Sequence, residues 1–149
     1  MNWKRTTVVS SLALLLCVAA ITNTAAAYNL PNPQLFFAGT ENYQANGQQW
    51  VKYNLRVVNL SAYPQFMFDP APYLPACGSN ANSSRTWVDI HQARTGQRLY
   101  GFCALGSPQD LDNLWFAVKQ GGHPPRYVYI VMTDRRAKKS YKSNVVATH

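Results

Sequence analysis

Residues 50–59, WVKYNLRVVN, alternate between apolar and polar side chains with a period of two. Val51, Tyr53, Leu55 and Val57 would share one face of an extended strand, and the lysine, asparagine and arginine between them would share the other. The alternation therefore predicts a β-strand that buries one face and exposes the other to solvent.

The same period recurs further along the chain. Residues 126–133 carry apolar side chains on both faces, which indicates a central strand. Residues 86–91 and 98–105 flank a turn at Arg94-Thr95-Gly96, so we expect them to form a hairpin. That turn would place Cys103 opposite Thr86. Other strands are expected at residues 34–38, 65–68, 114–119 and 140–146.

A short helix is expected to begin at Ser107. Its hydroxyl can cap the helix, Pro108 suits the first turn, and the carboxylate of Asp110 complements the exposed amides there. At most one helical turn is predicted, because residues 114–119 already have the pattern of a strand. About seven or eight short strands separated by turn residues favour an all-β fold, a β-sandwich.

Features of the last third of the chain carry a family resemblance: the strand 114–118, the Pro124-Pro125 corner, the strand with Tyr127 and Tyr129, a polar turn, and the segment 143–146. In this order they resemble the closing strands of a fibronectin type III-like, immunoglobulin-like sandwich. The segments 84–89 and 99–104 look like signatures of a small exported bacterial family. This resemblance implies a binding or spacer module more often than an enzyme.

The first 27 residues have the layout of a cleavable export signal. Lys4 and Arg5 give a positive start, residues 8–21 form an apolar run, and residues 25–27 supply small side chains at the cleavage site. The apolar run is shorter than the roughly 20 residues that span a bilayer. Residues 28–149 are therefore expected to form one exported domain, periplasmic or secreted, without a transmembrane segment.

Removal of the signal would change the cysteine count. Cys17 would leave, and Cys77 and Cys103 would remain to pair in an oxidising compartment. In the chain-entropy model, closing a loop of this length stabilises a protein by roughly 3–4 kcal/mol. Cys77 lies within a long irregular stretch, residues 69–84, which the disulfide is expected to pin to the sheet.

Removal of the signal would also change the charge. The whole chain has a net charge of +8, and loss of Lys4 and Arg5 leaves 12 basic and 6 acidic residues, a net charge of +6. A positive balance favours anionic partners. Nucleic acid is not expected among them, because the protein is predicted to be exported.

The sequence shows little catalytic chemistry. It contains no nucleophile elbow, no Gly-rich phosphate loop and no HExxH spacing. Trp87, Asp89 and His91 share one strand face, but two ligands do not make a tight metal site, and a half-buried sheet face is the favoured interpretation. We expect a protein that is not an enzyme, without catalytic residues, metal or cofactor.

Two surfaces are candidates for binding. The first, which we call the basic hairpin, consists of Arg135, Arg136, Lys138, Lys139 and Lys142, with Arg126 on the preceding strand. It could contact an acidic partner, or it could be a solvated turn whose lysines protect an edge strand from pairing. The second, which we call the aromatic loop, comprises Tyr63, Phe66, Phe68, Tyr73 and Leu74, an apolar patch beside Pro-rich segments.

These observations predict an exported, non-catalytic binding module of the cell envelope or the extracellular space. Its partner would be another envelope or extracellular protein, or an anionic surface. The alternative is a small exported enzyme inhibitor or immunity-type protein that uses the disulfide-pinned loop.

Overall fold

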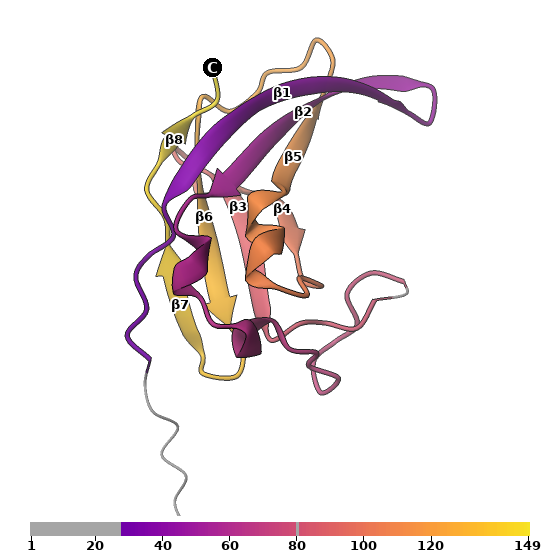
Figure 1. Cartoon of the computed structure of the whole chain (residues 1–149). Coiled ribbons are helices and arrows are strands. Elements are labelled where there is room, and N and C mark those ends of the chain that lie inside the picture. The colour runs from indigo at the N-terminus through magenta and orange to yellow at the C-terminus, as the bar shows by residue number, and fades with distance from the viewer. Residues whose placement is uncertain (1–27, 80) are drawn as a thin grey trace, which may run out of the picture.

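The computed structural model describes residues 28–79 and 81–149, which form two antiparallel sheets packed against each other (Figure 1). One sheet has the order β1 (Leu35–Ala45), β2 (Gln48–Val57) and β5 (Leu114–Lys119). The other has the order β4 (Arg98–Phe102), β3 (Thr86–Gln92), β6 (Tyr127–Asp134) and β7 (Lys139–Lys142), with β8 (Val146–Ala147) also paired to β6. The expected export signal, residues 1–27, lies outside the described residues.

The core lies between the two sheets and follows the period-two pattern of the sequence. Tyr53 and Leu55 of β2 point inward with Phe116 of β5, whose ring stacks on Tyr53 with centroids 4.9 Å apart. From the other sheet, Ile90 of β3 and Ile130 of β6 are fully buried against them. The predicted all-β fold of seven or eight strands in a sandwich-like arrangement is confirmed, and its antiparallel sheets are compatible with an immunoglobulin-like fold.

β6 is a central strand, as predicted. β3 pairs along one side of β6, and β7 and then β8 pair along the other. Residues 140–146, expected as one strand, are instead divided, because Asn144 turns away to bond with the other sheet. Its side chain accepts a hydrogen bond from the Leu35 amide at 2.7 Å and donates one to the Leu35 carbonyl at 3.0 Å.

The first hairpin is longer than the sequence analysis predicted. β1 continues from the expected strand to Ala45 and returns as β2 through a two-residue turn, Asn46-Gly47, with φ angles of 51° and 70°. Positive φ at both central residues is typical of the hairpin turn that matches strand twist. The end of this hairpin extends beyond the rest of the sandwich (Figure 1).

Three short 3-10 helices occur in the described residues, where one helical turn was expected: η1 (Leu60–Ala62), η2 (Gln65–Phe68) and η3 (Pro108–Asp112). The third confirms the predicted start, since the carboxylate of Asp110 accepts a hydrogen bond from the Ser107 amide at 3.1 Å. The prediction of a strand at residues 65–68 was wrong. The adjacent Met67 and Phe68 are both buried, which a strand with alternating faces does not allow.

The β3–β4 hairpin is confirmed, but its register differs from the prediction near the disulfide. The expected pairing holds at His91 and Arg98, and a bulge after Ile90 then shifts it by one residue, so that Val88 pairs with Phe102. Continuing this register places Cys103 beside Trp87 rather than Thr86. A bulge adds one unpaired residue to one strand, which the sequence period did not indicate.

The expected disulfide joins Cys77 to Cys103, with their Cα atoms 5.4 Å apart. It ties the irregular segment 69–84 to the end of β4, as predicted. In Figure 1 this segment projects from the sandwich below β4. None of the helices in the described part of the chain has the length and apolar character to cross a membrane.

Candidate functional site

The turn between β6 and β7 is built around the carboxylate of Asp134. Its Oδ1 accepts hydrogen bonds from the backbone amides of Arg136 and Ala137, both at 3.0 Å. An aspartate that binds amides two and three residues ahead fixes a turn locally. Lys138 completes the turn with a φ of 54°. The backbone that carries the basic hairpin therefore has a defined conformation.

Arg85 holds the same carboxylate from behind the turn. Its Nε and Nη2 donate to Oδ1 at 2.9 Å and Oδ2 at 2.6 Å, and the side chains of Arg85 and Asp134 are 14% and 6% exposed. Burial alone would raise the pKa of Asp134, but the hydrogen bonds from Arg85 and the turn amides outweigh it and lower the pKa. Asp134 is therefore ionised at neutral pH, with its charge directed into the fold.

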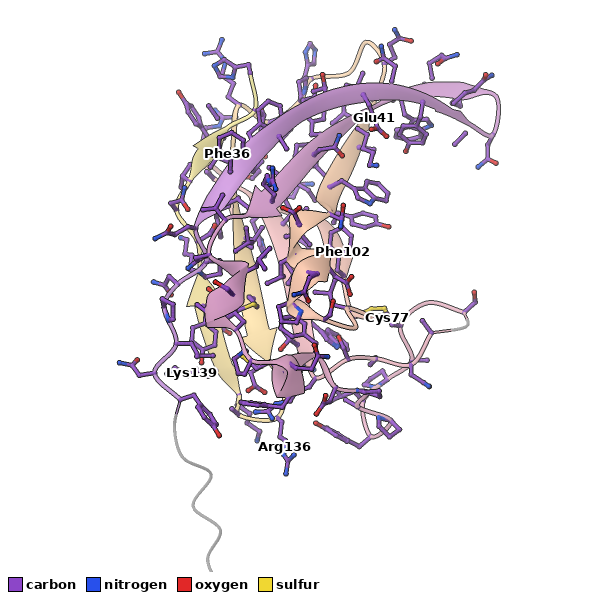
Figure 2. All side chains as sticks on the ribbon, in the orientation of Figure 1. Phe36, Glu41, Cys77, Phe102, Arg136 and Lys139 are labelled. Atoms are coloured by element: carbon purple, nitrogen blue, oxygen red, sulfur yellow. A yellow bond between two sulfur atoms is a disulfide. The ribbon has the colours of Figure 1, made fainter. Side chains whose placement is uncertain are left out.

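The cations of the basic hairpin differ in their surroundings. Arg136 and Lys138 are exposed, and Arg136 extends from the tip of the turn (Figure 2). Arg135 lies over the Trp87 ring at 4.4 Å, and Lys142 lies over the Tyr129 ring at 4.1 Å. These contacts orient the two side chains without neutralising them.

Lys139 is folded back toward the N-terminal segment. Its Nζ donates to the Tyr28 carbonyl at 3.0 Å and lies 5.3 Å from the Tyr141 ring centre. Figure 2 shows it on the flank of the hairpin rather than at the tip. Lys139 is therefore a less accessible member of the basic hairpin than Arg136 or Lys138.

The structure does not bring Arg126 to the basic hairpin. Arg126 precedes β6 and Arg135 follows it, and β6 is eight residues long. At about 3.3 Å per residue the strand separates them by roughly 26 Å. Arg126 instead lines a surface hollow with Arg94, at the opposite end of the sheet.

Most acidic residues of the described segments form ion pairs with cations that lie outside the basic hairpin. Four ion pairs occur there: Lys52 with Glu41, Arg56 with Asp112, Arg85 with Asp134, and Arg98 with Asp89. The other basic side chains of residues 28–79 and 81–149 take no part in these ion pairs. They are Arg94, Lys119, Arg126 and the five of the basic hairpin. Apart from Lys119 on β5 and Lys142 beside the middle of β6, this unpaired positive charge lies at the two ends of β6.

Trp87, Asp89 and His91 lie on the outer face of their sheet, as the alternation predicted. Asp89 pairs with Arg98 at 2.5 Å. The His91 ring stacks on Tyr129 with centroids 5.3 Å apart, and its Nδ1 is 2.9 Å from the Gly96 carbonyl oxygen. Among the described residues, no group of three or more His, Cys, Asp or Glu side chains is placed to hold a metal ion. The three side chains are thus engaged with separate neighbours.

The aromatic loop does not form the exposed patch that was expected. Tyr63 and Phe68 are only 2% and 1% exposed and belong to the core, and the Tyr63 hydroxyl donates to the Pro31 carbonyl at 2.9 Å. Burial raises the pKa of Tyr63 to about 12. Phe66 packs against the core beneath Arg85, at 5.0 Å, and Leu74 is half-buried. Tyr73 alone in this group is highly exposed, at 63%.

The loop that carries Tyr73 is held at several points besides the disulfide. Ala71 donates to the Ser83 carbonyl at 2.7 Å, and Cys77 donates to the Ala81 carbonyl at 2.9 Å. The Ser84 amide reaches the Cys103 carbonyl at 2.8 Å. Tyr73 is therefore presented on a restrained segment.

The hollow beside Arg94 and Arg126 was not predicted from the sequence. Its lining comes from segments that are far apart in the chain, the end of β3 and residues 123–127. The available signal was weak: the Pro124-Pro125 corner with basic residues nearby. Comparisons of the chain with protein-family models, with curated proteins and with solved structures gave no match.

Proposed function

We propose that this chain is an exported, non-catalytic binding module of immunoglobulin-like, fibronectin type III-like fold that contacts an acidic partner through the basic hairpin. The observation that carries the proposal is the position of Asp134. The carboxylate within the turn is committed to Arg85 and to two backbone amides, so the turn presents its cations without an acidic neighbour of its own.

The fixed turn favours binding. A turn held by four hydrogen bonds to the Asp134 carboxylate loses less conformational entropy on association than a flexible segment would. The positive charge at its tip would attract an acidic surface at long range, with a strength that falls as salt is added. The partner is another envelope or extracellular protein, or an anionic surface. Export is supported by the N-terminal sequence and is consistent with the disulfide.

A charge-matched pair of variants tests the proposal. Arg136→Gln/Lys138→Gln removes two exposed charges from the tip, and Arg94→Gln/Arg126→Gln removes two exposed charges from the other end of the sheet. We expect the first variant to elute from an anionic matrix at clearly lower salt than the second. Affinity capture from an envelope extract should lose its acidic partner only with the first.

Equal shifts for the two variants would contradict the proposal, because retention would then depend on net charge alone. The proposal would also be contradicted if the first variant eluted at the same salt concentration as the unchanged protein.

The inhibitor alternative is favoured by one specific observation, the exposed Tyr73 on the restrained loop 69–84. A rigid loop with a protruding aromatic ring suits insertion into the cleft of an enzyme. In this case affinity capture should recover one enzyme in stoichiometric amount. Tyr73→Ala should release it, and Arg136→Gln/Lys138→Gln should not.

A further inference from the structure

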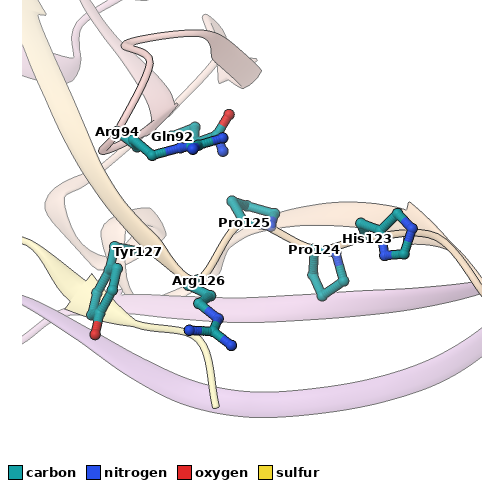
Figure 3. A pocket seen from close by; sticks show the side chains of 7 residues that line it. All are labelled: Gln92, Arg94, His123, Pro124, Pro125, Arg126 and Tyr127. Carbon is teal, nitrogen blue, oxygen red and sulfur yellow. The ribbon is translucent and has the colours of Figure 1, made fainter.

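A hollow lies at the end of the five-stranded sheet that is opposite the turn of the basic hairpin, and Figure 3 shows the side chains that line it. Its volume is about 440 Å³, within the range of small-molecule sites. The end of β3, the turn that follows it, the segment before β6 and the start of β6 supply the lining residues, which are Gln92, Arg94, His123, Pro124, Pro125, Arg126 and Tyr127.

The walls of the hollow are fixed by backbone hydrogen bonds. The Ala93 amide donates to the Tyr127 carbonyl at 2.8 Å, which joins the end of β3 to the start of β6. On the other side, the Thr148 amide donates to the Arg126 carbonyl at 3.1 Å, and its hydroxyl donates to the Pro125 carbonyl at 2.5 Å. Pro124 and Pro125 add stiffness because their φ angles are restricted. The hollow is therefore preformed.

The charges around the hollow are of one sign. Arg94 and Arg126 line it, and neither takes part in the ion pairs of the described residues. The lining contains no aspartate or glutamate, whereas Gln92 and Tyr127 add neutral hydrogen-bond donors. Arginine presents donors in a planar fork that matches carboxylate and phosphate oxygens.

The hollow continues into a second one. Both share His123, Pro124 and Arg126, and the second is completed by Tyr53, Thr148 and His149. No acidic side chain lines the second hollow either. Arg126 thus lies at the junction of the two hollows, which together form a groove.

We propose that this groove binds a small molecule bearing an oxyanion, a carboxylate or a phosphate, with Arg94 and Arg126 as the charged contacts. Gln92 and the proline wall position the ligand beside the two guanidinium groups. The site is separated from the turn of the basic hairpin by the length of β6, so it does not depend on the proposed function.

Titration of the disulfide-bonded protein tests this inference. Inorganic phosphate and citrate are added separately while amide chemical shifts are recorded, with ionic strength held constant by sodium chloride. We expect saturable shifts at Gln92, Arg94, His123 and Tyr127. Tighter binding of phosphate would identify a phosphate-bearing ligand, and tighter binding of citrate would identify a carboxylate-bearing one.

The two charge-matched variants also test this site: Arg94→Gln/Arg126→Gln is now the test variant, and Arg136→Gln/Lys138→Gln is the control. A hydrogen bond to a charged group contributes about 1.5–3 kcal/mol, so losing even one should weaken binding by at least about tenfold. We expect this loss for Arg94→Gln/Arg126→Gln and less than about twofold change for Arg136→Gln/Lys138→Gln. Since Arg94 is exposed in a turn, the single change Arg94→Gln provides the test if the double variant is poorly folded.

The inference would be overturned by shifts that do not saturate with either anion beyond the effect of chloride. It would also be overturned by equal weakening in both variants, which would mean that the anions respond to net charge.

Discussion

Replacing Asp134 by alanine should destabilise the protein by about 3 kcal/mol. The change removes the partner of a largely buried guanidinium and leaves two turn amides without their acceptor. Breaking a buried pair by removing one member costs about 3–5 kcal/mol, and the partial exposure of Arg85 places the value at the lower end. Asp134→Asn keeps a carbonyl for the turn amides and loses the charge, so it should cost less, about 2 kcal/mol.

Urea denaturation followed by tryptophan fluorescence would measure these costs. A double-mutant cycle of Arg85→Ala and Asp134→Ala should give a coupling free energy above about 1 kcal/mol. The control is the Lys52–Glu41 pair, whose side chains are 28% and 54% exposed, and its coupling should stay below about 0.5 kcal/mol. Similar coupling energies in the two cycles would refute the argument that the Arg85–Asp134 pair organises the turn.

The same pair predicts a pH dependence. The pKa of Asp134 is lowered in the folded protein, so its contribution to stability is present above the ordinary aspartate value of about 3.9 and is lost as the pH falls through the native value. The stability difference between the unchanged protein and Asp134→Asn should therefore shrink below about pH 4. A difference that stays constant down to pH 2 would contradict the assigned ionisation.

Three further changes test other parts of the fold by urea denaturation. Cys77→Ser/Cys103→Ser should cost roughly 3–4 kcal/mol and expose residues 69–84 to proteases, and a cost below about 1 kcal/mol would contradict the pinning role of the disulfide. Gly47→Val should cost about 1 kcal/mol because its φ is 70°, whereas Gln49→Val in the same hairpin should cost less than half of that. Tyr63→Phe loses the hydrogen bond to Pro31 and should cost about 1 kcal/mol. Burial raises the pKa of Tyr63 to about 12, so ionisation of this phenol should lower the free energy of unfolding of the unchanged protein between about pH 10 and 12. Tyr63→Phe should lack this loss. Equal alkaline profiles for the two proteins would argue against burial of the phenol.

Strands that face the core were predictable from the sequence. β5 has the predicted bounds, and β2, β3 and β6 differ from theirs by one or two residues, because burial of one face imposes a period of two on the side chains. The outer part of β1 was missed because residues 39–45 extend beyond the core and carry no such period. The Asn46-Gly47 pair, a strong hairpin signal, was the evidence that could have extended the strand.

Features that depend on tertiary packing were not predictable in the same way. Tyr63 and Phe68 lie in a Pro-rich segment whose local pattern does not indicate burial, and they become core residues because they pack against buried side chains of both sheets. The bulge after Ile90 likewise has no periodic signal.

The basic hairpin could be located from its sequence, but the Arg85–Asp134 ion pair that shapes its turn could not. Arg85 and Asp134 are 49 residues apart, and only the pairing of β3 with β6 brings them together. Arg94 and Arg126 line one hollow at the other end of the same strand pair, although the sequence suggested that Arg126 belonged to the hairpin.

The distribution of charge argues for binding more strongly than the net charge does. A positive balance that served solubility alone would be satisfied by cations at any exposed position. In the described residues three of the four ion pairs lie away from the ends of β6, and six of the eight remaining cations lie at those two ends. An anionic surface would respond to the charge of the basic hairpin, whereas a folded acidic partner would respond also to the turn conformation. Asp134→Asn separates these cases: it makes the protein more positive, so it should strengthen retention on an anionic matrix, and through loss of the Arg85 contact it should weaken capture of a partner that requires the ordered turn.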